Sequence, residues 1–353
     1  MRTIANKKTR LWLALVVASA GLAVLGAGAS HASPASVTIN LCALENPTAS
    51  LTGAVTVPIW GFADGGTGAS PDCSSVTASL PGPVYTVNEG DEVTINVANG
   101  LPADPTPATP GTTDHVVSLE IPGVSFDALS DADGAAVGDT ASYSFTASAP
   151  GTYLYESAGD AGRQEAMGLY GALIVRPTSA PDTPIDNQAY HAASTAYDVQ
   201  ATLVLSQVDP SFNADPDGFD MNDYLATYWL INGKAYPDTA NITVPGEQKV
   251  LLRYLNAGYD NTAMSLLGMH EQVLARDANL LNNPFAAGAE TLPAGGTEDT
   301  IATMPSFAPP TANGFPLYNR NLHVTNGPAL LNGNPLTPNA NYTPGGMLTF
   351  ITP

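Results

Sequence analysis

Histidine and cysteine, the side chains that most often bind transition metals, are scarce in this chain. After residue 32 the chain holds two cysteines and four histidines, which are Cys42, Cys73, His115, His191, His270 and His323. No two of these histidines are separated by a single residue, and no histidine adjoins either cysteine. Thiolate and imidazole are the ligands that hold copper through a redox cycle. The chain therefore offers few ligands for a transition metal, while a single metal ion at one histidine, with His270 as the candidate, stays open.

A second candidate for chemistry is a polar loop between two apolar runs. Residues 151–155 (GTYLY) and 167–175 (MGLYGALIV) are typical of strands. Between them lie Glu156, Asp160, Arg163 and Glu165, where a metal or a substrate could be bound.

The cysteines suggest a structural bond. In an exported protein a pair such as Cys42 and Cys73 predicts a disulfide. A loop of this length would stabilise the fold by about 3–4 kcal/mol.

The first residues have the pattern of a secretory signal peptide. Four basic residues precede an apolar run over residues 11–26, and small residues follow it. Residues 30–32 (SHA) form an acceptable cleavage site, with residues 27–29 (AGA) as an earlier option. No later run approaches the roughly 20 apolar residues of a membrane span. We therefore expect a signal peptide at residues 1–32, no membrane span, and a secreted, extracellular or cell-surface protein.

The charge of the chain limits its partners. The formal net charge is −21, and without the first 32 residues, which hold four of the 11 basic residues and no acidic one, it is about −25. Such a surface repels nucleic acid and anionic membranes. We expect no nucleic-acid partner, whereas a protein partner or self-association remains possible.

The frequent prolines and glycines, with short alternating runs between them, predict an all-β fold. Thirty prolines and 33 glycines separate short alternating runs, which is the pattern of β-sandwiches, and helix signals are nearly absent. The run over residues 115–126 is expected to form a strand that begins at an exposed His115. The length favours two domains, at residues 33–177 and 198–353, joined by a linker at 178–197 that is rich in Pro, Asp and Thr near its start.

Several motifs, in the same order, resemble the multicopper oxidases, a family built from cupredoxin domains. Residues 80–101 (LPGPVYTVNEGDEVTINVANGL) are similar to the entry of the first domain, and residues 151–177 to its strand-loop-strand. Residues 228–236 (YWLINGKAY) and 249–258 (KVLLRYLNAG) resemble signatures of the next domain. The resemblance covers about residues 80–350. It implies two cupredoxin-like Greek-key β-sandwiches in tandem, copper binding and oxidoreductase activity.

The resemblance also identifies the positions where copper ligands would stand. In the first domain the family's two histidine pairs correspond to Glu120 and Pro122, and to Glu156 and Ala158. The family's His-Cys-His motif is not found, because no cysteine follows residue 73. A working oxidase cannot be assembled from the ligands of this chain. We expect no catalytic residue and no bound cofactor, with copper or calcium as the alternatives.

Glu120 and Glu156 form a candidate metal site of another kind. In the family these two positions converge, so like charge and desolvation would raise the pKa of at least one carboxyl. A hard cation such as Ca²⁺ or Mn²⁺ could bind there, Arg163 could pair with one carboxylate, or water could reach both.

A second acidic segment resembles half of a calcium-binding loop. Residues 213–218 (NADPDG) match the first half of an EF-hand loop, but Tyr224 stands where that loop needs a bidentate Glu. We expect a solvated turn-rich loop, with calcium as the alternative.

The predicted function is therefore that of an exported structural or binding module that has lost the oxidase copper centres. Exposed edge strands would allow the protein to join an extracellular surface assembly, but nothing in the sequence requires such an assembly. The alternative is an oxidoreductase or electron-transfer protein that binds copper or another metal at one reduced site.

Overall fold

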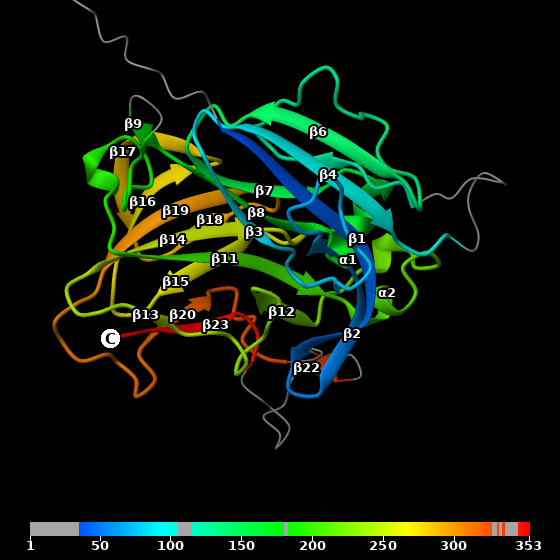
Figure 1. Cartoon of the computed structure of the whole chain (residues 1–353). Helices are drawn as coiled ribbons and strands as arrows, with labels where there is room; N and C mark the ends of the chain where they lie inside the picture. The colour runs from blue at the N-terminus through cyan, green and yellow to red at the C-terminus, as the bar shows by residue number, and fades with distance from the viewer. Residues whose placement is uncertain (1–34, 105–114, 180–182, 327–329, 332–333, 336–344) are drawn as a thin grey trace, which may run out of the picture. The chain divides into compact units, whose positions relative to one another are not determined.

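Strands make up nearly all of the regular structure (Figure 1). The computed structural model describes residues 35–104, 115–179, 183–326, 330–331, 334–335 and 345–353. The signal peptide predicted at residues 1–32 lies outside the described residues. Within the part of the chain that the structure describes, no helix is long and apolar enough to cross a membrane.

The first sandwich contains two four-stranded sheets. One has the order β2-β1-β4-β6 and consists of Val55–Asp64, Ser36–Thr52, Glu92–Gly100 and Thr140–Thr146. The other has the order β3-β8-β7-β5 and consists of Val84–Asn88, Tyr170–Arg176, Gly151–Ser157 and Leu119–Glu120. Strands β1 and β4 are parallel, as are β3 and β8, and the other neighbours are antiparallel.

The second sandwich repeats this topology with more strands in each sheet. Its first sheet has the order β12-β11-β14-β19-β16-β17 and consists of Tyr228–Ile231, Val199–Val208, Lys249–Asn256, Thr297–Thr303, Glu271–Arg276 and Asn279–Ala287. Its second sheet has the order β13-β23-β20-β15-β18 and consists of Ile242–Thr243, Leu348–Thr352, Phe315–Asn319, Thr262–Leu266 and Glu290–Leu292. The parallel pairs β11–β14 and β13–β23 correspond to β1–β4 and β3–β8. The prediction of two cupredoxin-like β-sandwiches in tandem is confirmed, and the domain boundaries stay a prediction.

Short elements connect the strands. These are β9 (Thr178–Ser179), β10 (Thr183–Pro184), β21 (Leu330–Leu331), β22 (Asn334–Pro335), the helices α1 (Arg163–Met167) and α2 (Pro210–Ala214), and 3-10 turns at Asp160–Gly162, Ala193–Thr195 and Met221–Asp223. Neither α-helix was predicted, because five residues are too few to show a helical period.

Strands β7 and β8 are buried on both faces. Tyr155 and Leu173 point into the core of the first sandwich. Leu154 and Ala172 instead pack with Leu255 of β14 in the second sandwich. The two strands consequently lie between the other sheet of the first sandwich and the second sandwich, as Figure 1 shows. This double burial explains why their sequences are continuous apolar runs and do not alternate.

The strand predicted over residues 115–126 is mostly wrong. Only β5, Leu119–Glu120, pairs as a strand in this segment. Pro122 has no N–H to donate to a neighbouring strand. Gly123 follows at a φ of 87°, a left-handed conformation that ends the extended run.

The predicted disulfide between Cys42 and Cys73 is confirmed. Cys42 lies on β1 with a fully buried side chain, and Cys73 belongs to the loop that follows β2. The bond therefore fixes this long loop to the first sheet.

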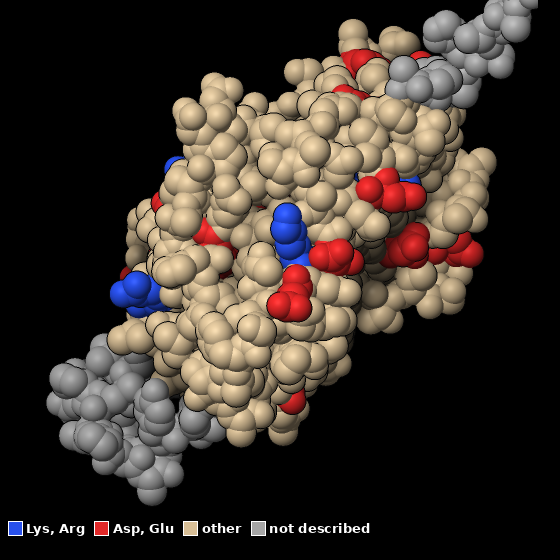
Figure 2. Space-filling view, turned by 90° about the vertical axis from the view of Figure 1, so that its left-hand side faces the viewer, with Lys and Arg blue, Asp and Glu red and all other residues tan. Residues whose placement is uncertain are grey.

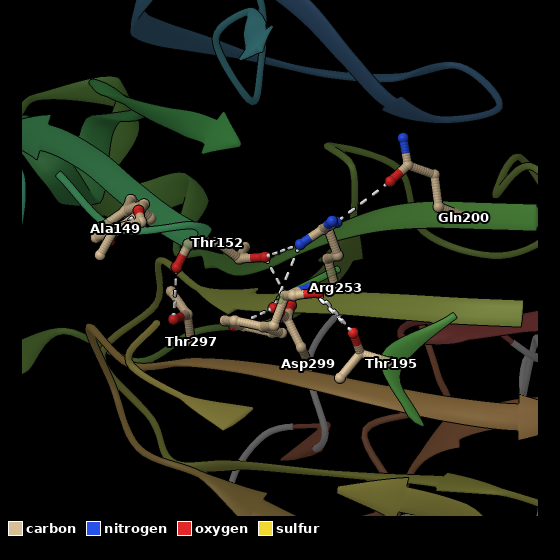
Figure 3. Close-up of polar contacts among 9 residues, drawn as sticks. Ala149, Thr152, Thr195, Gln200, Arg253, Thr297 and Asp299 are labelled. Atoms are coloured by element: carbon tan, nitrogen blue, oxygen red, sulfur yellow. Dashed lines mark hydrogen bonds and ion pairs between the residues drawn. The ribbon is translucent and has the colours of Figure 1, made fainter. Parts of the chain in front are cut away.

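A buried network of charged and polar side chains joins the two sandwiches (Figure 3). Arg253 of β14 and Asp299 of β19 form an ion pair at 3.3 Å, and each side chain is 1% exposed. Thr152 of β7 donates to Asp299 at 2.6 Å and accepts from Arg253 at 2.9 Å. Tyr190, from the segment between the sandwiches, donates to the other Asp299 oxygen at 2.6 Å. The Asp299 carboxylate thus binds side chains from both sandwiches and from the segment that connects them.

We predict that Asp299→Asn destabilises the protein strongly. The substitution keeps the shape of the side chain but leaves the Arg253 guanidinium buried without a counter-charge, which costs about 3–5 kcal/mol. The free energy of unfolding, from urea titrations of both proteins, measures the loss.

Asp133→Asn is the matched control, because Asp133 is exposed and such surface changes alter stability by about 0.5 kcal/mol or less. Equal unfolding midpoints for the two variants would contradict the assigned role of the network.

Candidate functional site

Glu120 and Glu156 are direct neighbours across two strands. The pairing of β5 with β7 sets these two residues opposite each other. Along β5 and its continuation, Leu119 and Ile121 are buried, whereas Glu120 and Pro122 are exposed. The two carboxyls consequently share the sheet face that points away from the core.

An open cavity of 630 Å³ lies beside these positions. Its lining includes Glu120, Pro122 and Ala158, which occupy three of the four positions where the resemblance places copper ligands. A carboxylate, a proline ring and a methyl group offer no imidazole or thiolate, and the two cysteines are joined to each other. This donor set does not fit copper. Among the described residues, no group of three or more His, Cys, Asp or Glu could hold a metal ion.

Glu156 also lines a second cavity, of 230 Å³, together with Glu165. Burial raises the pKa of the Glu156 carboxyl to about 7, and the charge of Glu120 adds to this effect. Burial raises the pKa of Glu165 to about 7 as well, with further contributions from Glu156 and Glu120. Three carboxyls from β5, β7 and α1 therefore lie close enough to influence one another.

Arg163 does not neutralise these carboxyls. Its Nη1 atom donates to the carbonyl oxygens of Pro216 at 2.6 Å and Phe219 at 3.0 Å. Both carbonyls belong to the acidic segment of the second sandwich. The alternative in which Arg163 pairs with Glu120 or Glu156 is wrong, because the guanidinium binds backbone oxygens of that segment.

His115 is buried, and the prediction that it is exposed is wrong. Its ring lies 4.5 Å from the ring of Trp60, and its Nε2 atom is 2.9 Å from Asp217. Its Nδ1 atom is 2.6 Å from the carbonyl of Pro102. Burial disfavours the imidazolium, but the Pro102 carbonyl and the Asp217 carboxylate outweigh it and raise the pKa of His115.

The half EF-hand pattern has a structural role. Asp217 contacts His115, and the carboxylate of Asp215 accepts from the backbone N–H of Gly218 at 3.2 Å. Asn213 is buried, and its amide donates to the Pro58 carbonyl at 2.9 Å. The segment thus uses these side chains to fold and to bind the first sandwich.

The other histidines lie apart from the carboxyls. His270 is exposed in the turn before β16 and lines neither cavity that contains Glu120 or Glu156. His191 contacts Glu89 at 2.8 Å. His323 stacks on Trp229 with ring centroids 4.0 Å apart, and burial lowers its pKa.

A third cavity, of 730 Å³, was not predicted from the sequence. Its lining includes Trp229 and His323, and it shares Gln207, Tyr224 and Tyr259 with the 230 Å³ cavity. These side chains stand at positions from Gln207 to His323, 116 residues apart, so no local pattern marks them. We call the two adjoining cavities the junction cleft.

Comparisons with known proteins agree with this architecture. A family model described as multicopper oxidase matches residues 66–180. L-ascorbate oxidase of Cucurbita maxima is 31% identical over 145 residues, which cover 39% of this chain and 22% of that protein. Copper resistance protein A of Escherichia coli is 34% identical over 109 residues, which cover 31% of this chain and 17% of that protein. Part of the first sandwich, residues 66–180, is therefore similar in sequence to the multicopper oxidases.

Solved structures extend the likeness in fold to both sandwiches. The blue copper oxidase of Nitrosomonas europaea has a TM-score of 0.67 at 22% identity, covering 90% of this chain and 86% of that chain. The copper nitrite reductase of the same organism has a TM-score of 0.59 at 20% identity, covering 81% and 89%. At such identity the likeness shows the fold alone. The matches to the curated relatives span about a fifth of their length.

We predict that Glu156 and Glu165 make stability depend on pH. Their folded pKa of about 7 exceeds the ordinary value of 4.5. Between these values the unfolded chain has lost a proton that the folded chain keeps, so stability falls as pH rises from 4.5 to 7. Glu165→Gln should reduce this pH-dependent loss of unfolding free energy by about 1–2 kcal/mol, after allowance for the partial exposure of the side chain. Urea titrations across this pH range measure the difference between variant and wild type.

Glu92→Gln serves as the control, because Glu92 is exposed on β4. Its difference from wild type should stay constant with pH. A constant difference for Glu165→Gln as well would show that the cleft carboxyl ionises as it does in water.

Proposed function

We propose that this chain is an exported, copper-independent relative of the multicopper oxidases that acts as a binding or structural module. One observation carries the proposal, namely that Glu120, Pro122, Glu156 and Ala158, and no histidine, stand at the four positions where the resemblance places first-domain copper ligands. Fold similarity to copper enzymes does not supply an active site, because function depends on the side chains that the fold positions.

The similarity to known oxidases supports the loss of copper ligands in a specific region. The matched segment, residues 66–180, includes all four of these positions. The strand pairing there is intact, so the substituted side chains stand on a folded scaffold. Carboxylates prefer hard cations and do not stabilise the cuprous state. Loss of the imidazoles therefore removes redox copper chemistry from this sheet.

The junction cleft supports a binding role. Its larger cavity, 730 Å³, falls in the size range of small-molecule sites, which are about 300–1,000 Å³ and often lie between domains. The cleft combines aromatic walls with the half-buried carboxyls of Glu156 and Glu165. A disulfide is typical of exported proteins, which supports location outside the cytosol.

A structural role has its own support on strand β17. This strand is at the edge of the six-stranded sheet, where its backbone is free to pair on one side. Its apolar side chains Leu280 and Phe285 are 40% and 41% exposed. Such an edge suits contact with a protein partner or with another copy in an extracellular assembly.

We predict that the purified protein is colourless and binds copper at most substoichiometrically. Protein incubated with Cu²⁺ and then dialysed should show no visible charge-transfer band and no oxygen uptake with ascorbate or phenols. Elemental analysis and an oxygen electrode provide the measurements, with an authentic ascorbate oxidase as the positive control.

Glu120→Gln tests the remaining metal alternative. A hard cation held by Glu120 and Glu156 would be lost in this variant, whereas we expect the metal content of variant and wild type to be equal. Stoichiometric copper together with oxygen-consuming turnover would overturn the proposed function in favour of a reduced metal site.

A further inference from the structure

The smaller cavity of the junction cleft is acidic. Glu156 from β7 and Glu165 from α1 both line the 230 Å³ cavity. The Oε2 atom of Glu165 is buried and has no hydrogen-bond partner among the described residues. A buried carboxylate oxygen without a donor is costly, and a ligand that donates to it would recover this cost.

Aromatic side chains line the larger cavity of the cleft. The rings of Tyr224 and Tyr259 meet edge to face, with centroids 5.3 Å apart and planes at 82°. Trp229 lies further along, stacked on His323. Trp229 is 6% exposed, yet its indole N–H has no acceptor within the described part of the chain. Two buried polar atoms in the cleft walls therefore lack partners.

Among the described residues that line the cleft, acidic side chains have no basic counterpart. Asp260 adds a third carboxyl to the lining, and neither a lysine nor an arginine lines the two cavities as described. The nearby Arg163 is held by two backbone carbonyls. The raised pKa values of Glu156 and Glu165 agree with a cleft that lacks a cation of its own. On the face drawn in Figure 2, basic side chains are likewise few.

We propose that the junction cleft binds a protonated arylalkylamine, with its ammonium group between Glu156 and Glu165 and its ring among Tyr224, Tyr259 and Trp229. The ammonium N–H groups form charge-assisted hydrogen bonds with the carboxylates. The aromatic faces attract the cation and cover the apolar part of the ligand. This inference rests on the proposed binding role and assigns a ligand class to it.

The geometry explains why a cation is favoured over a neutral ligand. A neutral alcohol of the same shape fills the same aromatic space but leaves the carboxyls without a counter-charge. A carboxylic acid adds a further negative charge beside Glu156, Glu165 and Asp260. Charge at one end of the ligand is therefore the property that the cleft selects.

The test uses the purified protein with 2-phenylethylamine and its neutral analogue 2-phenylethanol as probes. Calorimetry gives the affinities, and tryptophan fluorescence locates the site, since Trp229 lines the cleft and Trp60 lies buried in the first core. We expect saturable binding of the amine and affinity lower by about tenfold or more for the alcohol, as expected for loss of one charged hydrogen bond. Trp229→Phe should abolish the fluorescence change.

Two substitutions extend the test. Glu165→Gln should weaken amine binding by about tenfold without affecting 2-phenylethanol, and the exposed Glu92→Gln should leave both affinities unchanged. Equal affinity for amine and alcohol in the wild-type protein, or no saturable amine binding, would overturn the proposal even if Glu165→Gln did not fold. Neither result would affect the proposed absence of oxidase copper, which metal analysis decides separately.

Discussion

The buried ion pair between Arg253 and Asp299 is the interaction on which the arrangement of the two sandwiches depends. Both side chains lie in the six-stranded sheet of the second sandwich, and Thr152 reaches them from the first. A buried charge pair is favourable only when its remaining donors and acceptors are satisfied. Because Thr152 and Tyr190 provide these contacts, the pair needs both the first sandwich and the connecting segment in place.

This constraint sets the position of the candidate site. Strand β7 continues from Thr152 to Glu156, and β14 leads from Arg253 towards Ala257 and Gly258, which line the junction cleft. The ion pair therefore fixes one end of two strands whose other ends form the cleft. Further contacts close the far side, where Tyr259 donates to the Gly162 carbonyl and His115 contacts Asp217. The cleft is built between two points of attachment.

The half-buried carboxyls of Glu156 and Glu165 have an energetic consequence. Burial and mutual repulsion raise the pKa of Glu156 and Glu165, so ionisation of these groups costs stability near neutral pH. Apolar side chains at these positions would avoid this cost. Shifted carboxyls in a cleft are a feature of functional sites, although structural networks also produce them. Their position beside aromatic walls is what favours a binding role over an inert surface.

The sequence by itself determined the all-β class, the tandem sandwiches, the disulfide partners and the absence of imidazole at the four positions where the resemblance places copper ligands. These properties depend on local periodicity, ordered motifs and residue identity, which are readable without coordinates. Only the tertiary structure showed that His115 is buried against Asp217, that Arg163 binds backbone carbonyls, and that Glu165 joins Glu156 in a cleft. These contacts join residues far apart in the chain, 102 positions for His115 and Asp217 and 147 for Thr152 and Asp299. A residue's local pattern does not specify such partners, because the packing of one sandwich on the other determines which side chains meet.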